Sequence, residues 1–165
     1  MKKPLLALFL LLLPVFAVAK GAGYSNTQWG MTPAEVVAAE NGKAILITPV
    51  QYSGSLGKAQ IPDITIGSHI YTVFFLFDAA DRLIQTNLTS NEKKNGGIID
   101  QQFESLHQLL TQKYGEPQFK SANKVTWRTA DTTIELSKIV MRGIMAQTSV
   151  RYIPNTVVSS DTSNL

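Results

Sequence analysis

The chain has 165 residues, enough for one domain with at most a short appendage. Hydrophobic residues make up 44% and charged residues 16%, which excludes a disordered chain and a coiled coil. The net charge is +3, and loss of Lys2 and Lys3 lowers the basic count from 15 to 13 against 12 acidic residues, so the charge does not indicate nucleic-acid binding. The absence of cysteine excludes disulfides, zinc–thiolate sites, thiol nucleophiles and a lipidated cysteine.

Residues 1–19 have the organisation of a signal peptide. Two lysines precede an apolar run that extends to Ala19 and is broken only by Pro14. Small residues at 17 and 19 occupy the positions that a signal peptidase recognises, so we expect cleavage between Ala19 and Lys20. The alternative, a membrane anchor, needs about 20 apolar residues. The run is shorter than this, so we expect export to the periplasm, with secretion as the alternative and no membrane span after processing.

The first helix is expected at about residues 33–41. Thr32 can cap it, Pro33 suits the first helical position, and Glu35 completes a capping box. Asn41 and Gly42 end it, because glycine accepts a left-handed backbone.

A second helix is expected at about residues 98–114. Its apolar residues recur every three or four positions and form one stripe: Ile99, Phe103, Leu106 and Leu110. Gly115 and Pro117 end this helix. We expect the stripe to pack with Trp127 and Ile134.

The remaining apolar segments indicate antiparallel strands joined by hairpins. A four-residue loop at 78–81 would pair Phe75 with Ile84 and Val73 with Thr86. The next hairpin would pair Val125 with Leu136 and Trp127 with Ile134. In the last hairpin a three-residue loop, 141–143, places Gly143 at a left-handed position and pairs Leu136 with Thr148, Ile134 with Val150, and Val140 with Ile144.

The predicted fold class is α+β, with an antiparallel sheet of about five or six strands and the two helices packed on one face. The helix-then-strands order occurs twice, which allows a degenerate duplication at most. Residues 20–28 are expected to form a flexible lead-in, 29–153 a single domain, and 154–165 a disordered polar tail.

Two motifs carry a family resemblance. The segment Trp29–Val36, with its Gly-Met-Thr-Pro-Ala-Glu sequence, resembles the first helix of small exported envelope proteins with the β-lactamase-inhibitor-protein-like fold. That group includes outer-membrane-assembly lipoproteins. The run from Phe103 to Pro117, followed by Trp127, is similar to many uncharacterised exported bacterial proteins. The resemblance implies binding of other proteins rather than catalysis, although the lipid-anchored cysteine is missing.

Catalytic and metal-binding patterns are not evident in the sequence. His69 and His107 lack zinc-ligand spacing, and the serines around Gly54 do not form a nucleophile motif. Asp78 and Asp81 bracket a hairpin loop, where aspartate commonly bonds the backbone. We therefore expect no catalytic, cofactor or metal site, and no cofactor.

The connection over residues 51–68 is unusually long for a compact domain. One interpretation is that the next strand begins at Ile64 and the rest is a flexible turn. The other is an exposed, mobile loop at 51–60 that contacts a partner through Tyr52 and Leu56, with Lys58 on its rim.

Two function classes follow from the sequence. The first is a noncatalytic periplasmic protein that binds a protein or an envelope component. The alternative is a small periplasmic hydrolase or ligand-binding protein whose site residues are separated in the sequence.

Overall fold

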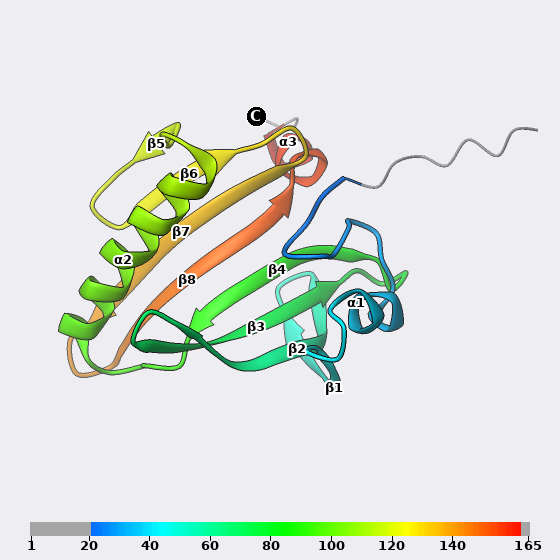
Figure 1. Cartoon of the computed structure of the whole chain (residues 1–165), viewed down its shortest axis with the longest axis horizontal. Helices are drawn as coiled ribbons and strands as arrows, with labels where there is room; N and C mark the ends of the chain where they lie inside the picture. Colours follow the sequence, from blue (N-terminus) through cyan, green and yellow to red (C-terminus); the bar gives the residue numbers. More distant parts are fainter. Residues whose placement is uncertain (1–20, 163–165) are drawn as a thin grey trace, which may run out of the picture.

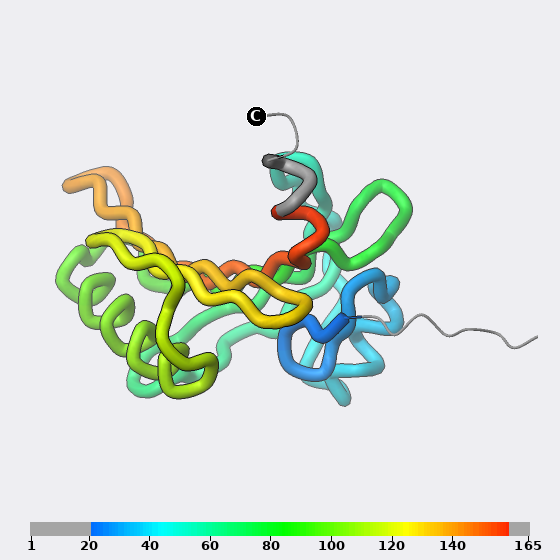
Figure 2. The backbone as a smooth tube through the Cα atoms, turned by 90° about the horizontal axis from the view of Figure 1, so that it is seen from above, coloured from blue at the N-terminus to red at the C-terminus, as the bar shows by residue number. Residues whose placement is uncertain are grey.

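One antiparallel sheet of eight strands runs through the molecule, with two helices on one of its faces (Figures 1 and 2). The computed structural model describes residues 21–162, so the expected signal peptide and the cleavage site between Ala19 and Lys20 lie outside the described residues. The elements, in chain order, are α1 (Pro33–Ala39), β1 (Ile45–Tyr52), β2 (Ser55–Ile66), β3 (His69–Phe77), β4 (Leu83–Ser90), α2 (Gly96–Tyr114), β5 (Phe119–Lys120), β6 (Lys124–Arg128), β7 (Thr132–Met141), β8 (Met145–Pro154) and α3 (Asn155–Thr162).

The strand order is β1-β2-β3-β4-β8-β7-β6-β5, and all neighbouring strands are antiparallel. Two four-stranded meanders therefore meet where β4 pairs with β8, and a helix precedes each meander. Read from the opposite edge of the sheet, the order is β5-β6-β7-β8-β4-β3-β2-β1, so each strand of the first meander takes the place of its counterpart in the second. The topology is thus that of a duplicated unit, related by a twofold axis between β4 and β8.

The predicted fold class underestimated the sheet. The structure has eight strands rather than five or six, and three helices among the described residues rather than two. The extra strands come mainly from residues 51–66, because Tyr52 ends β1, a turn at 53–54 follows, and β2 has twelve residues. Gly54 in this turn has a φ of 73°, a left-handed conformation that glycine adopts without strain.

The predicted helices lie close to their expected positions. The capping box of α1 is present, since Thr32 accepts from the Glu35 amide and the Glu35 carboxylate accepts from the Thr32 amide. Helix α2 begins two residues earlier than expected, because the Asn95 side chain accepts from the backbone N–H groups of residues 97 and 98.

The core lies between the sheet and α1 and α2. Two rows of cross-strand neighbours form its sheet side, Val73–Leu88–Val150–Leu136–Val125 and Phe75–Thr86–Tyr152–Ile134–Trp127. The four-residue stripe of α2 is buried against the second meander. Three of its members, Phe103, Leu106 and Leu110, belong with Trp127 and Ile134 to one buried cluster, as expected from the sequence. The Trp127 indole also donates to the Gly115 carbonyl at 3.0 Å.

The described parts of the two segments that flank the predicted domain both contact it in the structure. Residues 21–28, expected as a flexible lead-in, form a turn in which Tyr24 packs edge-on against Tyr152, with ring centroids 5.2 Å apart. Trp29 donates its indole N–H to Thr132 at 2.8 Å, which ties this segment to β7. In the polar tail, expected to be disordered from 154 to 165, α3 begins at Asn155, whose side chain accepts from Thr133 at 2.8 Å.

Of the three predicted hairpin registers, one is confirmed and two are displaced. Val125 faces Leu136 and Trp127 faces Ile134, as predicted. Phe75 faces Thr86 instead of Ile84, because the chain turns over five residues and the pairing is irregular between Leu76 and Phe77. The last hairpin has the expected three-residue length, but its loop is 142–144 rather than 141–143.

Candidate functional site

The sheet face opposite α1 and α2, which we call the open face, is lined by two rows of side chains that are all polar except Phe74. Residues alternate between the two faces of a strand, so each polar residue here lies next in sequence to a core residue. The first row is Gln60–Phe74–Asn87–Arg151–Glu135–Thr126, and the second is Thr72–Thr89–Ser149–Ser137–Lys124. Arg151 is exposed and the other members are half-buried, so these groups are both ordered and accessible.

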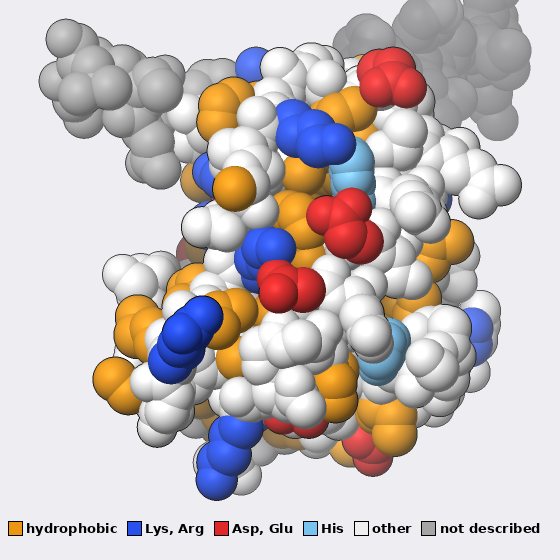
Figure 3. Space-filling view, turned by 90° about the vertical axis from the view of Figure 1, so that its left-hand side faces the viewer, with side chains coloured by type: hydrophobic (Ala, Val, Ile, Leu, Met, Phe, Trp, Pro, Cys, Tyr) orange, Lys and Arg blue, Asp and Glu red, His pale blue; other side chains and the backbone are white. Residues whose placement is uncertain are grey.

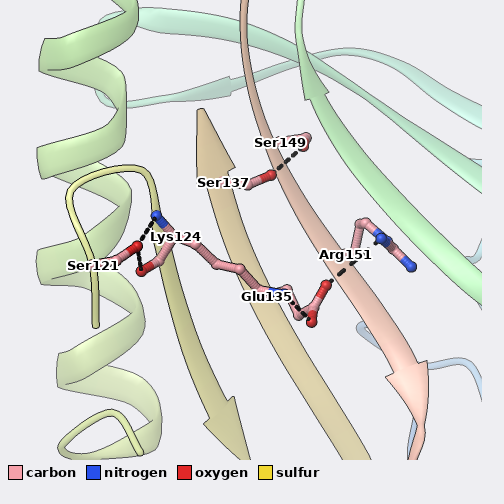
Figure 4. Close-up of polar contacts among 6 residues, drawn as sticks. All are labelled: Ser121, Lys124, Glu135, Ser137, Ser149 and Arg151. Carbon is pink, nitrogen blue, oxygen red and sulfur yellow. Dashed lines mark hydrogen bonds and ion pairs between the residues drawn. The ribbon is translucent and has the colours of Figure 1, made fainter. Parts of the chain in front are cut away.

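Three charged residues cross the open face on neighbouring strands. Lys124 on β6 donates to the Glu135 carboxylate on β7 at 2.7 Å, and the Arg151 guanidinium on β8 lies 3.6 Å from the other carboxylate oxygen (Figure 4). Side-chain exposure is 19% for Glu135 and 44% for Arg151, so the carboxylate is the more buried partner. Because the Arg151 contact is long and a guanidinium has five N–H donors, Arg151 can bind a further acceptor.

A pair of hydroxyl groups continues this polar surface toward β4. The Ser137 and Ser149 hydroxyl oxygens are 3.1 Å apart across β7 and β8 (Figure 4). They lie in the second row, directly beside the charged residues of the first. The open face therefore offers hydroxyl, amide and charged groups in fixed register.

A hollow of about 660 Å³ lies on the open face. Its walls are the β1–β2 turn and α3, and its floor includes all three charged residues. The lining residues are Ser53, Gly54, Ser55, Ile84, Gln85, Lys124, Glu135, Arg151, Ile153, Val157 and Val158. Figure 2 shows that the β1–β2 turn and α3 stand on the side of the sheet away from α1 and α2. The volume falls within the range of ligand-binding clefts, and its floor is polar.

Tyr52, Leu56 and Lys58 belong to the β1–β2 hairpin, not to the expected mobile loop at 51–60. The Tyr52 ring lies 6.4 Å from that of Phe74, and burial raises the pKa of the Tyr52 phenol above its usual value. Leu56 pairs with Gln51 and Phe77 within the sheet. Lys58 forms an ion pair with Asp81, which fixes the strand to the β3–β4 loop.

Turn chemistry accounts for Asp78, as expected. Its carboxylate accepts from the Ala80 and Arg82 amides, each at 2.9 Å. His69 begins β3, far in sequence from His107, which lies on α2 with its ring 6.0 Å from that of Trp127. In residues 21–162 no group of three or more histidine, aspartate or glutamate side chains is arranged to hold a metal ion.

His107 also borders a second hollow, of about 470 Å³, between α2 and the segment that leads into β5. Glu116 and Lys120 lie on the same rim, and Thr111 is also among the lining residues. The Thr111 oxygen is buried without a hydrogen-bond partner among the described residues. This hollow brings an imidazole and a carboxylate to one rim, and a small ligand-binding or hydrolytic site would use such groups.

The charged residues of the open face were not identified from the sequence. The alternation Ile134-Glu135-Leu136-Ser137 already indicates which side chains leave the core. However, the predicted last register placed Glu135 opposite Ser149, whereas it lies opposite Arg151. A shift of two residues keeps every side chain on its face and changes only its cross-strand partner. The alternation therefore indicates that Glu135 leaves the core, but it does not identify Arg151 as its cross-strand partner.

None of the helices described in residues 21–162 is long and apolar enough to cross a bilayer. No curated protein and no solved structure shows significant similarity to the chain. One family model does match, that of the TP0088 domain, over residues 22–163. This match covers both meanders, all three helices and the open face. The chain therefore belongs to the TP0088 domain family.

Proposed function

We propose that this chain is a noncatalytic protein-binding module of the bacterial envelope, and that it holds its partner on the open face. The observation that carries the proposal is the set of ion-paired residues Lys124, Glu135 and Arg151 on a sheet face that α1 and α2 leave uncovered. The signal peptide expected at residues 1–19 supports an exported location, with the periplasm preferred to secretion. The resemblance to envelope proteins of the β-lactamase-inhibitor-protein-like type agrees with this class.

The chemistry of the open face favours a protein segment that presents an acidic side chain. Arg151 has donors to spare, and a carboxylate is the acceptor that a guanidinium binds best. Tyr52 and Phe74 supply aromatic surface further along the same sheet, and aromatic residues and arginine provide much of the binding energy at protein interfaces. The hydroxyl pair next to them offers donors and acceptors to a backbone.

Site-specific photo-crosslinking in the native envelope tests the proposal. A photoreactive residue at Ser149 on the open face should give an adduct of discrete mass, while the same residue at the exposed Ser105 of α2 should not. Arg151→Gln should reduce the Ser149 adduct about tenfold, as for loss of one charged interface contact. Lys43→Gln, an exposed position near α1, is the matched control and should leave the adduct unchanged. Equal adducts from Ser149 and Ser105, or an adduct insensitive to Arg151→Gln, would contradict the proposal.

A ligand-binding or hydrolytic role is the second candidate, and the hollow beside His107 is the observation that favours it. Under this hypothesis His107→Gln abolishes turnover or binding of a small ester or amide, while Arg151→Gln has no effect. Under the first hypothesis Arg151→Gln reduces the Ser149 adduct and His107→Gln has no effect on it. The same pair of variants therefore distinguishes the two functions.

A further inference from the structure

The tip of the β7–β8 hairpin carries Ile144, the most exposed large apolar side chain among the described residues, and a group of further exposed apolar side chains beside it. Ile144 in the loop is 76% exposed, and Met141 before it is 49% exposed. Ile139 and Val140 complete a group of four exposed apolar residues within six positions. Apolar exposure of this density marks an interaction site, since isolated exposed apolar residues are ordinary but contiguous ones are not.

Basic residues surround this tip. Arg142 lies in the loop itself, and Lys94 lines a small hollow with Gly143, Ile144 and Met145. The backbone holds the two segments together, because the Ala146 amide donates to the Lys93 carbonyl at 2.7 Å. Figure 3, which views this end of the molecule, shows basic side chains lying against apolar ones. None of Lys93, Lys94 and Arg142 forms a salt bridge within residues 21–162.

The acidic residues near the tip are already engaged. Glu92 accepts from the backbone N–H groups of residues 93, 94 and 95 at 2.8–3.0 Å, and these bonds, with a smaller contribution from the charge of Lys94, lower the pKa of its carboxyl. Asp100 is bound by Lys138 at 2.6 Å. Lys93, Lys94 and Arg142 have no salt bridge among the described residues, so their charged groups can face an external anion.

The duplicated topology provides an internal comparison. The β3–β4 loop occupies the equivalent place in the first meander, and its residues 78–82 are Asp-Ala-Ala-Asp-Arg. That loop is closed by hydrogen bonds to Asp78 and by the Lys58–Asp81 ion pair. A polar loop thus satisfies this position of the fold, so folding does not require the isoleucine and methionine side chains at the β7–β8 tip.

We propose that the β7–β8 tip is a peripheral membrane-binding site that inserts Met141 and Ile144 into the interface of a bilayer containing anionic phospholipid. The tip is a projecting end of a hairpin (Figure 2), a shape suited to insertion between headgroups. Lys93, Lys94 and Arg142 then lie at headgroup level, where each basic residue contributes about 1 kcal/mol toward an anionic surface, or roughly fivefold in affinity. This site is separate from the open face and does not depend on the function proposed for it.

The chain has no cysteine, so a single introduced cysteine can carry an environment-sensitive fluorophore at one chosen position. The full chain carries the label at Ile144→Cys and, as the matched control, at Ile45→Cys, an isoleucine of the edge strand β1 that is 47% exposed. With vesicles of phosphatidylglycerol and phosphatidylethanolamine, the label at 144 should shift to the blue and the label at 45 should not. Each label reports on the surroundings of its own position. Vesicle binding through residues 1–19 alone is therefore not expected to shift the label at 144 and leave the label at 45 unchanged.

Charge reversal completes the test. Lys94→Glu with Arg142→Glu should weaken the blue shift at position 144 by at least twentyfold in lipid concentration, while Lys43→Glu should not change it. No shift at 144 with anionic vesicles, an equal shift with phosphatidylcholine alone, or a concentration-dependent shift without vesicles would each overturn the proposal. The last of these results would assign the tip to contact between copies of the chain.

Discussion

Thr86 offers a direct test of the packing described for the core. Its side chain is fully buried between Phe75 and Tyr152 on the two neighbouring strands, and its hydroxyl has no hydrogen-bond partner among the described residues. Burial of an unpaired hydroxyl costs about 1–3 kcal/mol in proteins. Thr86→Val replaces that hydroxyl with a methyl group of similar size and keeps the β-branched shape that suits a strand. We expect the free energy of unfolding to rise by about 1–2 kcal/mol.

Thr148 provides the matched control, since it is equally buried on the adjacent strand β8. Its hydroxyl donates to the Ile99 carbonyl of α2 at 3.2 Å. Thr148→Val therefore removes this hydrogen bond and leaves the Ile99 carbonyl with one donor fewer. The free energy of unfolding should fall by about 1 kcal/mol. The same substitution at two buried threonines is thus expected to have opposite signs.

Urea denaturation followed by circular dichroism measures both variants against the parent. For a domain of this size the expected gain corresponds to a rise in Tm of about 3–8 °C for Thr86→Val. If Thr86→Val destabilises the protein as much as Thr148→Val does, the Thr86 hydroxyl makes an interaction that the packing does not reveal. The m-values should remain equal, because neither change alters the surface exposed on unfolding.

Three further predictions concern the core and two titrating groups. Phe103→Ala should cost about 3–5 kcal/mol by urea denaturation, whereas Leu109→Ala, on the exposed side of α2, should cost less than 1 kcal/mol. Glu92→Gln should lower Tm at pH 7 but not at pH 2, because a lowered native pKa stabilises the fold above the unfolded pKa near 4.5 and that contribution disappears as the pH falls through the native value. Burial, the charge of Glu40 and Tyr114 raise the pKa of Tyr24 to about 12, so the stability from its neutral phenol should be complete below pH 10 and decline toward pH 12. Tyr24→Phe should remove this alkaline loss, as measured by Tm against pH.

The helices could be predicted because their signals are local. The capping box at Thr32 and the stripe from Ile99 to Leu110 each depend on residues within a few turns. Strand β2 was missed for a physical reason. Its buried positions at 55, 57 and 59 are serine, glycine and alanine, and the pairing with β3 is irregular between Gly57 and Ala59, so burial leaves little hydrophobic pattern in the sequence. The Gly57 position stays small because a Cβ there would lie 3.0 Å from the Tyr52 ring.

The cross-strand partner of a residue was harder to predict than the face of the sheet on which its side chain lies. Alternation places Glu135 and Arg151 away from the core whatever the hairpin register. Their pairing depends on whether the last loop begins at Met141 or at Arg142, a choice between turns that both accommodate Gly143. The candidate site is thus a property of the assembled sheet, and only its separate polar residues were visible beforehand.

The open face follows from the way the two meanders are joined. Antiparallel β4 and β8 are related by a twofold axis perpendicular to the sheet, and such an axis keeps both units facing the same way. Both α1 and α2 must then cover one face and leave the other uncovered (Figure 2). Polar residues on an uncovered face are expected for solubility alone. What solubility does not require is the unequal division between the units: the charged residues Lys124, Glu135 and Arg151 all come from the second meander, and the aromatic pair comes from the first. That asymmetry in a duplicated topology is the feature that the proposed binding function would explain.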